Sequence, residues 1–200
     1  MNEQQEHLDK FTALYRLAEP QAGYFTTDQA LAAGFSHRQL SYYASTGRFL
    51  HIRRGIYRLA HFPHSPHEDL FIAWLRVGKG AVISHESALA LYELSDVVPT
   101  ETHLIVPPGA SRRHQGLRLH TNRLQADDIT AYAGLPVTTV SRTLAHVTAA
   151  GLADELIIQA AHEAIQRGLV TKKRLLDMAN QQGGRLQRLV HTALEGMETW

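Results

Sequence analysis

The sequence predicts an α+β protein in which a small helical module precedes a larger mixed domain. The spacing of hydrophobic residues switches between helical and strand-like periods along the chain, and two prolines interrupt both patterns between His61 and His67. From Gly151 onward the pattern is helical throughout. We therefore expect one domain over residues 1–62 and a second over residues 63–200, with C-terminal helices over about residues 151–200.

The first module has the element order of a winged helix-turn-helix. Caps support two of its helices, because Thr26 or Thr27 can cap one and Ser36 the next, and a glycine follows each. After Gly47 the hydrophobic period becomes two, which predicts a hairpin. The expected helices span residues 7–18, 27–33 and 37–46, and the expected strands span residues 49–53 and 56–59 around a turn at residues 54–55.

The second domain mixes helices and strands before its helical tail. Expected strands span residues 81–83, 102–106, 117–121, 129–133 and 135–140. Expected helices span residues 69–77, 84–94, 141–148, 152–167, 171–180 and 186 to about 196. The apolar face of the tail is equally consistent with a core and with a homodimer contact.

Composition excludes several classes of protein. With 44% hydrophobic and 20% charged residues among 200, the chain is typical of a folded protein and not of a disordered one. It has no cysteine, so disulfides, thiolate metal sites and cysteine nucleophiles are excluded. No uncharged stretch reaches the ~20 apolar residues of a membrane span, and the polar N-terminus does not look like a secretory signal. We expect a cytoplasmic protein without a membrane contact.

Positive charge is concentrated in the first module although the net charge is only +1. Between Pro20 and Ala60 five arginines stand against one aspartate. Such a basic hairpin beside a polar helix face is typical of double-stranded DNA binding, since phosphates attract the arginines and the helix can reach base edges. The plainer alternative is an exposed basic hairpin that binds nothing. The charged hairpin residues are Arg48, His51, Arg53, Arg54 and Arg58, and the outward helix residues are His37, Arg38, Ser41, Tyr42 and Ser45.

Seven segments of the chain form a recognisable series. They are Gly23-Tyr-Phe-Thr-Thr-Asp-Gln-Ala-Leu-Ala-Ala-Gly34, Ser36-His-Arg-Gln-Leu40, Gly47-Arg-Phe-Leu50, Arg53-Arg-Gly-Ile-Tyr-Arg58, Ala81-Val-Ile-Ser-His-Glu-Ser-Ala-Leu-Ala-Leu-Tyr92, His103-Leu-Ile-Val-Pro107 and Leu135-Pro-Val-Thr-Thr-Val-Ser-Arg-Thr-Leu144. In order and spacing these segments resemble the AbiEi-type antitoxins and related transcriptional regulators with an N-terminal winged helix-turn-helix. Together they cover most of residues 20–148.

The resemblance implies a non-enzymatic antitoxin of a type IV toxin–antitoxin system that represses its own promoter. The partners implied are operator DNA and a nucleotidyltransferase-like toxin, which need not be contacted directly. Two departures are Ala145-His146, where relatives often have an acidic residue, and a tail too short for an appended nuclease-like domain. The DNA contacts expected are Thr27, Ser36, His37, Arg38, Ser41, Tyr42, Arg48, Arg53, Arg54 and Arg58.

Other candidate sites are weaker. Ser84 beside His85 could suggest a nucleophile and its base, but neighbours at a helix start point apart, and Ser84 fits better as a cap. His61, His64 and His67 could bind zinc or nickel, but the prolines between them favour an extended linker. We therefore predict no catalytic residue, no metal and no cofactor.

Three other functional possibilities stay open. Asp96 and Glu101-Thr-His103 lack the lysine of a magnesium-dependent nuclease motif. A second basic cluster from Arg112 to Arg123 could be a strand edge or a second DNA contact. The alternative from another class is a protein-interaction module that binds a partner protein through its α+β domain, with a purely structural winged helix.

Overall fold

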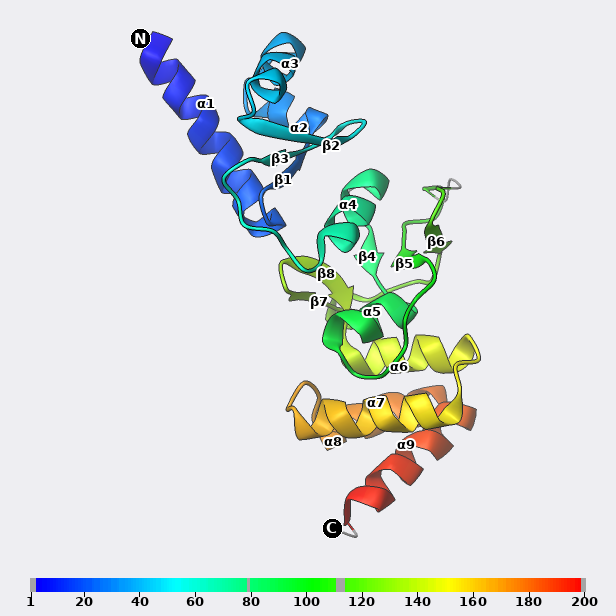
Figure 1. Ribbon diagram of the computed structural model, residues 1–200. Helices are drawn as coiled ribbons and strands as arrows, with labels where there is room; N and C mark the ends of the chain where they lie inside the picture. The colour runs from blue at the N-terminus through cyan, green and yellow to red at the C-terminus, as the bar shows by residue number, and fades with distance from the viewer. Residues whose placement is uncertain (1–2, 79, 111–113, 199–200) are drawn as a thin grey trace. The chain divides into compact units, whose positions relative to one another are not determined.

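The computed structural model describes residues 3–78, 80–110 and 114–198 (Figure 1). Its chain divides into two compact units, one of residues 1–79 with 133–135 and the other of residues 80–132 with 136–200. Helices and strands occur in both units, and the protein is α+β as the sequence predicts. No helix among the described residues is both long and apolar enough to cross a membrane.

The first unit has the helix and hairpin order of a winged helix-turn-helix. Its sheet is antiparallel, in the order β1-β3-β2. The three-residue strand β1 was not predicted, because its side chains show no alternation long enough to detect. The elements are α1 (Glu3–Ala18), the 3₁₀ turn η1 (Glu19–Gln21), β1 (Tyr24–Thr26), α2 (Thr27–Ala32), α3 (His37–Ser45), β2 (Phe49–Arg53), β3 (Ile56–Leu59) and α4 (Glu68–Val77).

The first unit extends one helix beyond the boundary that the sequence predicts. Helix α4 packs on β1 and β3, and Phe71 of α4 stacks on Tyr24 of β1 with ring centroids 5.9 Å apart. Both rings are almost fully buried, so separating α4 from the sheet would expose them. The compact unit therefore ends after residue 79, although the prolines near His61 suggested a boundary at 62.

Aromatic side chains fill the core of the first unit. Phe35 and Phe49 are almost fully buried, and the half-buried ring of Phe11 from α1 meets Phe35 edge-on at 5.1 Å. Tyr43 of α3 completes this cluster and contacts Phe11 in the same edge-on manner. Edge-to-face pairs stabilise a core beyond the area that they bury. These contacts also fix the orientation of α3, with Leu40 and Tyr43 facing the core.

A capping box fixes where α3 begins. Ser36 Oγ accepts from the Gln39 backbone N–H at 3.2 Å, and Gln39 Oε1 accepts from the Ser36 N–H at 2.9 Å. Thr26 and Gln29 form the same pair at α2. Both helices therefore start at residues with non-helical backbone whose side chains satisfy the first free N–H groups.

Replacing Ser36 by alanine is expected to lower the free energy of unfolding by about 1 kcal/mol, because a cap hydrogen bond is lost. Urea unfolding followed by circular dichroism measures this. Ser45→Ala is the matched control, since the Ser45 hydroxyl only donates back to the Tyr42 carbonyl at the other end of α3. Equal loss in both variants would show that the capping box does not stabilise α3.

The second unit contains a mixed sheet in the order β6-β5-β4-β8-β7. Strand β4 runs antiparallel to β5 and parallel to β8, and β5 runs parallel to β6. Helix α5 packs on β5 and α6, and α6 packs on the tail helices. The elements are β4 (Val82–Ile83), α5 (His85–Tyr92), β5 (Thr102–Ile105), β6 (Leu117–His120), the 3₁₀ turn η2 (Ala126–Asp128), β7 (Ile129–Tyr132), β8 (Leu135–Thr138), α6 (Val140–Ala149), α7 (Asp154–Gln166), α8 (Lys172–Gln182) and α9 (Gly184–Glu198).

The tail helices pack into the second unit. Ile157 and Ala160 of α7 and Leu189 and Val190 of α9 are buried within the single chain. Helix α9 contacts both α7 and α8 (Figure 1). Their apolar faces therefore form a core within the chain, which is one of the two roles that the periodicity allowed.

Candidate nucleic-acid interface

Helix α3 presents a polar face to solvent. His37, Arg38, Ser41 and Tyr42 are exposed, and Tyr42 keeps 60% of its surface accessible. The opposite face of α3 buries Leu40 in the core, which anchors the helix and leaves its outer side chains accessible to solvent. Hydrogen-bonding groups on one exposed helix face are what base-edge recognition in a DNA major groove requires.

The hairpin of β2 and β3 carries the two exposed arginines expected at its turn. Arg53 ends β2, Arg54 follows it, and both side chains are exposed. Gly55 completes the turn with a φ of +77°, which a residue with a side chain rarely adopts. The Thr27 N–H donates to the Gly55 carbonyl at 3.0 Å, so the start of α2 is tied to this turn.

A third arginine near the turn was not among the predicted contacts. Arg76, in the last turn of α4, is half-buried. Burial and the nearby positive charge of Arg53 lower the pKa of Arg76. The positive charges of Arg53 and Arg76 therefore lie close enough to influence each other. The proximity of Arg76 to Arg53 was not predicted, because the sequence assigns the helix that contains Arg76 to the second domain.

Arg48 is exposed, but its guanidinium is already engaged. It lies 5.5 Å from the ring centroid of Phe11 and 5.8 Å from that of Tyr43. A cation over aromatic faces is stabilised electrostatically and held in one position. Arg48 therefore links α1, α3 and the start of the hairpin, and any phosphate contact that it makes is a second role.

Arg58 is buried, although the sequence predicts it as an exposed DNA contact. It is only 5% exposed, and its guanidinium lies 5.7 Å from the ring centroid of Tyr24. Side chains alternate along β3, so Arg58 shares the buried face with Ile56. Tyr24, which pairs with Arg58 in the sheet, has its pKa raised to about 12 by burial and then by the Glu68 carboxylate.

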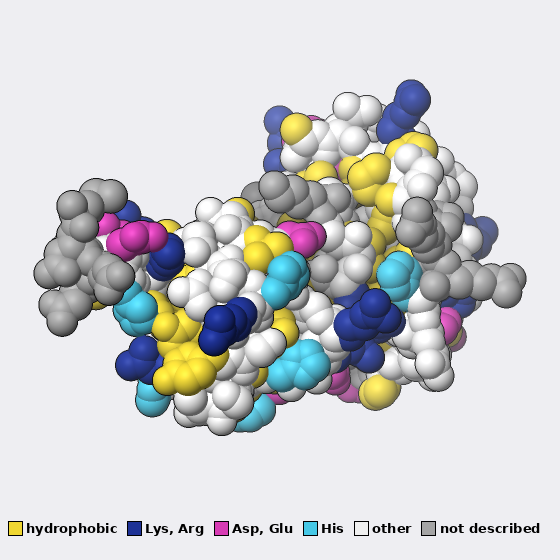
Figure 2. All heavy atoms as spheres, turned by 90° about the horizontal axis from the view of Figure 1, so that it is seen from above, with side chains coloured by type: hydrophobic (Ala, Val, Ile, Leu, Met, Phe, Trp, Pro, Cys, Tyr) yellow, Lys and Arg dark blue, Asp and Glu magenta, His cyan; other side chains and the backbone are white. Residues whose placement is uncertain are grey.

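Basic side chains are scattered over the surface of the protein. Figure 2 shows dark-blue Lys and Arg and cyan His side chains separated by white polar surface, with magenta carboxylates among them. The predicted second cluster lies in the other unit, where Arg118 and Arg123 are exposed, and Arg112 and Arg113 fall outside the described residues.

The linker histidines do not assemble. His61 and His64 are exposed, His67 is half-buried, and His64 Nδ1 lies 3.2 Å from a Glu68 carboxylate oxygen. Among the described residues, the group of possible metal ligands that does come together contains none of these three.

Ser84 does not cap α5, contrary to the sequence prediction. Its side chain accepts no hydrogen bond from the first turn, and its Oγ instead lies 3.0 Å from His85 Nδ1. His85 has a left-handed backbone with a φ of +51°, which breaks the usual geometry of a helix start and lets the two neighbouring side chains meet.

Two comparisons with known proteins bear on these observations. The model of a family described as "Transcriptional regulator, AbiEi antitoxin" matches residues 13–60, which contain α3 and the hairpin. It confirms the resemblance over this part of the chain. No curated protein matches the sequence. The crystal structure of the RV2827C protein from Mycobacterium tuberculosis superposes with a TM-score of 0.51 at 14% identity, covering 93% of this chain and 76% of that one. This likeness supports the fold alone.

Proposed function

We propose that the protein is a DNA-binding transcriptional autorepressor, the antitoxin of a type IV toxin–antitoxin system. The observation that carries the proposal is the exposed polar face of α3 in the same compact unit as the exposed arginines of the hairpin turn. The match to an antitoxin and transcriptional regulator family covers both elements. The protein has no catalytic role in this proposal, and it acts in the cytoplasm on its own promoter.

The two elements have different tasks. Arg53 and Arg54 contact phosphates, which supplies affinity that depends on salt but not on sequence. The side chains of α3 contact base edges, and Arg38 in its first turn is suited to guanine, because a guanidinium can donate two hydrogen bonds to O6 and N7. Thr27 and Ser36, at the starts of α2 and α3, are further DNA contacts in this proposal.

Replacing Arg38 by alanine is expected to reduce the preference for the upstream DNA over a scrambled fragment by about 10-fold or more, since one base contact is lost. Fluorescence anisotropy with both fragments measures the ratio of the two dissociation constants. Ser45→Ala, at the far end of the same helix, is the control and should leave the ratio unchanged. An unchanged ratio in Arg38→Ala would show that α3 is not the helix that recognises the DNA sequence.

The toxin is the functional partner in this proposal. In this proposal the toxin need not be contacted directly, so the autorepressor needs only its operator DNA and, for paired half-sites, a second copy of itself. Co-expression with the neighbouring gene product followed by purification tests this. A stable complex formed by a protein that does not bind DNA would favour the protein-interaction module instead.

A further inference from the structure

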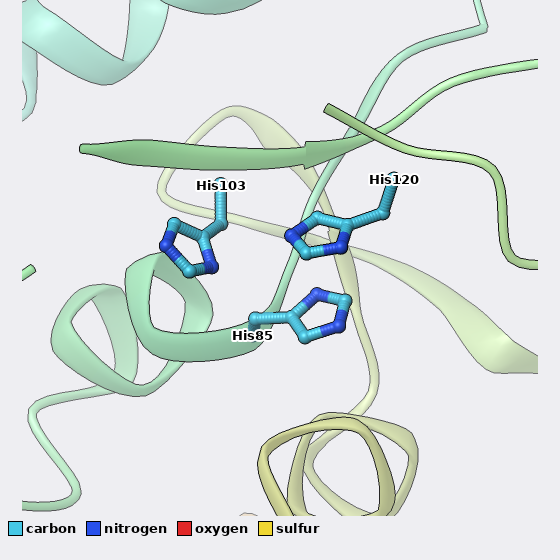
Figure 3. A group of neighbouring side chains, drawn as sticks. All are labelled: His85, His103 and His120. Carbon is cyan, nitrogen blue, oxygen red and sulfur yellow. The ribbon is translucent and has the colours of Figure 1, made fainter. Parts of the chain in front are cut away.

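Four histidines meet in the second unit, which contains neither α3 nor the hairpin. His85 is the first residue of α5, His103 lies on β5, His120 ends β6 and His146 lies on α6. Figure 3 shows the rings of His85, His103 and His120 turned toward one another from three different elements. No short sequence motif joins them, because the fold alone brings these segments together.

Three of them lie close enough together to be candidate metal ligands. One nitrogen from each of His85, His103 and His120 lies within 4.8 Å of the other two. In a tetrahedral site with metal–nitrogen bonds of about 2.0–2.1 Å, such nitrogens lie about 3.4 Å apart. Rotation of the side chains can close this difference. The rings of His85 and His120 stack with their centroids 3.7 Å apart. The His146 ring also stacks on His85, with centroids 4.8 Å apart.

Three nitrogens of this group lack hydrogen-bond partners among the described residues. His103 Nδ1, His120 Nε2 and His146 Nδ1 are inaccessible to solvent and have no hydrogen-bond partner among the described residues. His103 and His85 are 5% and 4% exposed. A buried polar atom without a partner costs free energy, so several in one place indicate that something else satisfies them.

The surroundings keep these rings in the neutral form that binds metals. Burial, followed by the neighbouring histidines, lowers the pKa of His85 to about 3, and burial lowers those of His120 and His146 to about 4. Burial and the charge of Arg118 also lower the pKa of His103. At neutral pH each ring therefore carries a lone pair and no charge.

Two features of His85 indicate that its orientation is imposed. Its left-handed backbone, with φ at +51°, is unfavourable for a residue with a side chain and is retained only where the surroundings demand it. The Ser84 hydroxyl, fully buried, lies 3.0 Å from His85 Nδ1. If that nitrogen donates to the hydroxyl, Nε2 holds the lone pair, which is how outer hydrogen bonds orient metal-binding histidines.

We propose that His85, His103 and His120 bind a divalent transition metal ion, with zinc as the expected occupant. Three imidazole nitrogens without a carboxylate suit zinc and its neighbours and do not suit magnesium or calcium, which require oxygen ligands. Three protein ligands leave a fourth position for water or an anion. The positive charge of Arg118, exposed on β6 beside these rings, favours an anionic fourth ligand. His146, stacked on His85, is a positioning residue.

The test is zinc binding by the full chain without an affinity tag. Protein stripped with a chelator is titrated with Zn²⁺ in competition with a chromogenic chelator, and we expect one equivalent to bind. His120→Gln is the test variant because His120 is the least buried of the three, and it should weaken binding by about 100-fold. The control is the triple variant His61→Gln, His64→Gln and His67→Gln, which removes the linker histidines and should bind as tightly as the parent.

Two results would overturn the proposal: equal binding by the parent and His120→Gln, or loss of binding in the linker variant. If His120→Gln fails to fold, as circular dichroism would show, Co²⁺ added to the parent decides. Ligation by three nitrogens predicts the visible absorption bands of tetrahedral Co²⁺, and their absence contradicts the proposal. Because the readouts are metal affinity and metal spectra, failure here leaves the DNA-binding proposal untouched.

Discussion

The double variant Arg53→Ala, Arg54→Ala is expected to bind every DNA fragment about 10-fold to 100-fold more weakly than the parent at moderate salt. Both side chains are exposed at the hairpin turn, and each is assigned one phosphate contact. Loss of two contacts should also reduce the slope of log affinity against log salt by about 2. Because phosphates are the same in every sequence, upstream and scrambled fragments should lose affinity equally.

A control variant with the same change in net charge distinguishes the loss of specific phosphate contacts from a weaker overall electrostatic attraction to DNA. Arg16→Ala with Arg188→Ala also removes two exposed arginines, one from α1 and one from α9. Those positions are not assigned to the interface, so the salt slope should stay within experimental error of the parent's. Parent-like binding by the hairpin variant, or an equal loss in the control, would show that the hairpin is not the phosphate-binding element.

Arg142→Met is expected to lower the free energy of unfolding by about 3–5 kcal/mol, the largest stability effect that we assign to one residue. The Arg142 Nε donates to an Asp128 carboxylate oxygen at 2.8 Å, and the Gln125 N–H donates to the other oxygen at 2.9 Å. Burial alone would raise the pKa of Asp128, but these bonds hold it below its ordinary value. Without Arg142 the ionised carboxylate is left buried and unpaired. Urea unfolding monitored by circular dichroism measures the loss.

Two further variants show whether the charge is responsible. Asp128→Asn combined with Arg142→Met removes both charges and should recover part of the lost stability. Glu6→Gln breaks the exposed pair of Lys10 and Glu6 on α1, where Lys10 Nζ lies 2.8 Å from the carboxylate, and should leave the free energy of unfolding unchanged within experimental error. Equal costs for the buried and the exposed pair would contradict this account.

Local signals in the sequence predicted much of the first unit. Ser36 and Thr26 are short polar residues before apolar periodic segments, and both cap helices as expected. The period of two after Gly47 correctly predicted the hairpin. The same alternation could have placed Arg58 on the buried face with Ile56, because residues two apart in a strand share a face.

Features that depend on distant segments were not predictable. The packing of α4 on β1 moves the unit boundary past Arg76, and nothing within that helix indicates it. The ligand set of His85, His103 and His120 comes from one helix start and two strands. Parallel pairing of β5 and β6 places His103 and His120 near each other, and pairing of distant strands cannot be read from local spacing. The linker histidines are close in sequence but are not part of this group.

Binding of the purified full chain to its own upstream DNA and to a scrambled fragment, titrated over a series of salt concentrations, tests the central claim most directly. The account predicts tight binding to the upstream fragment with a clear preference over the scrambled one at every salt concentration, and a steep loss of affinity for both as salt rises. Equal affinity for the two fragments, or no binding at low salt, would contradict it.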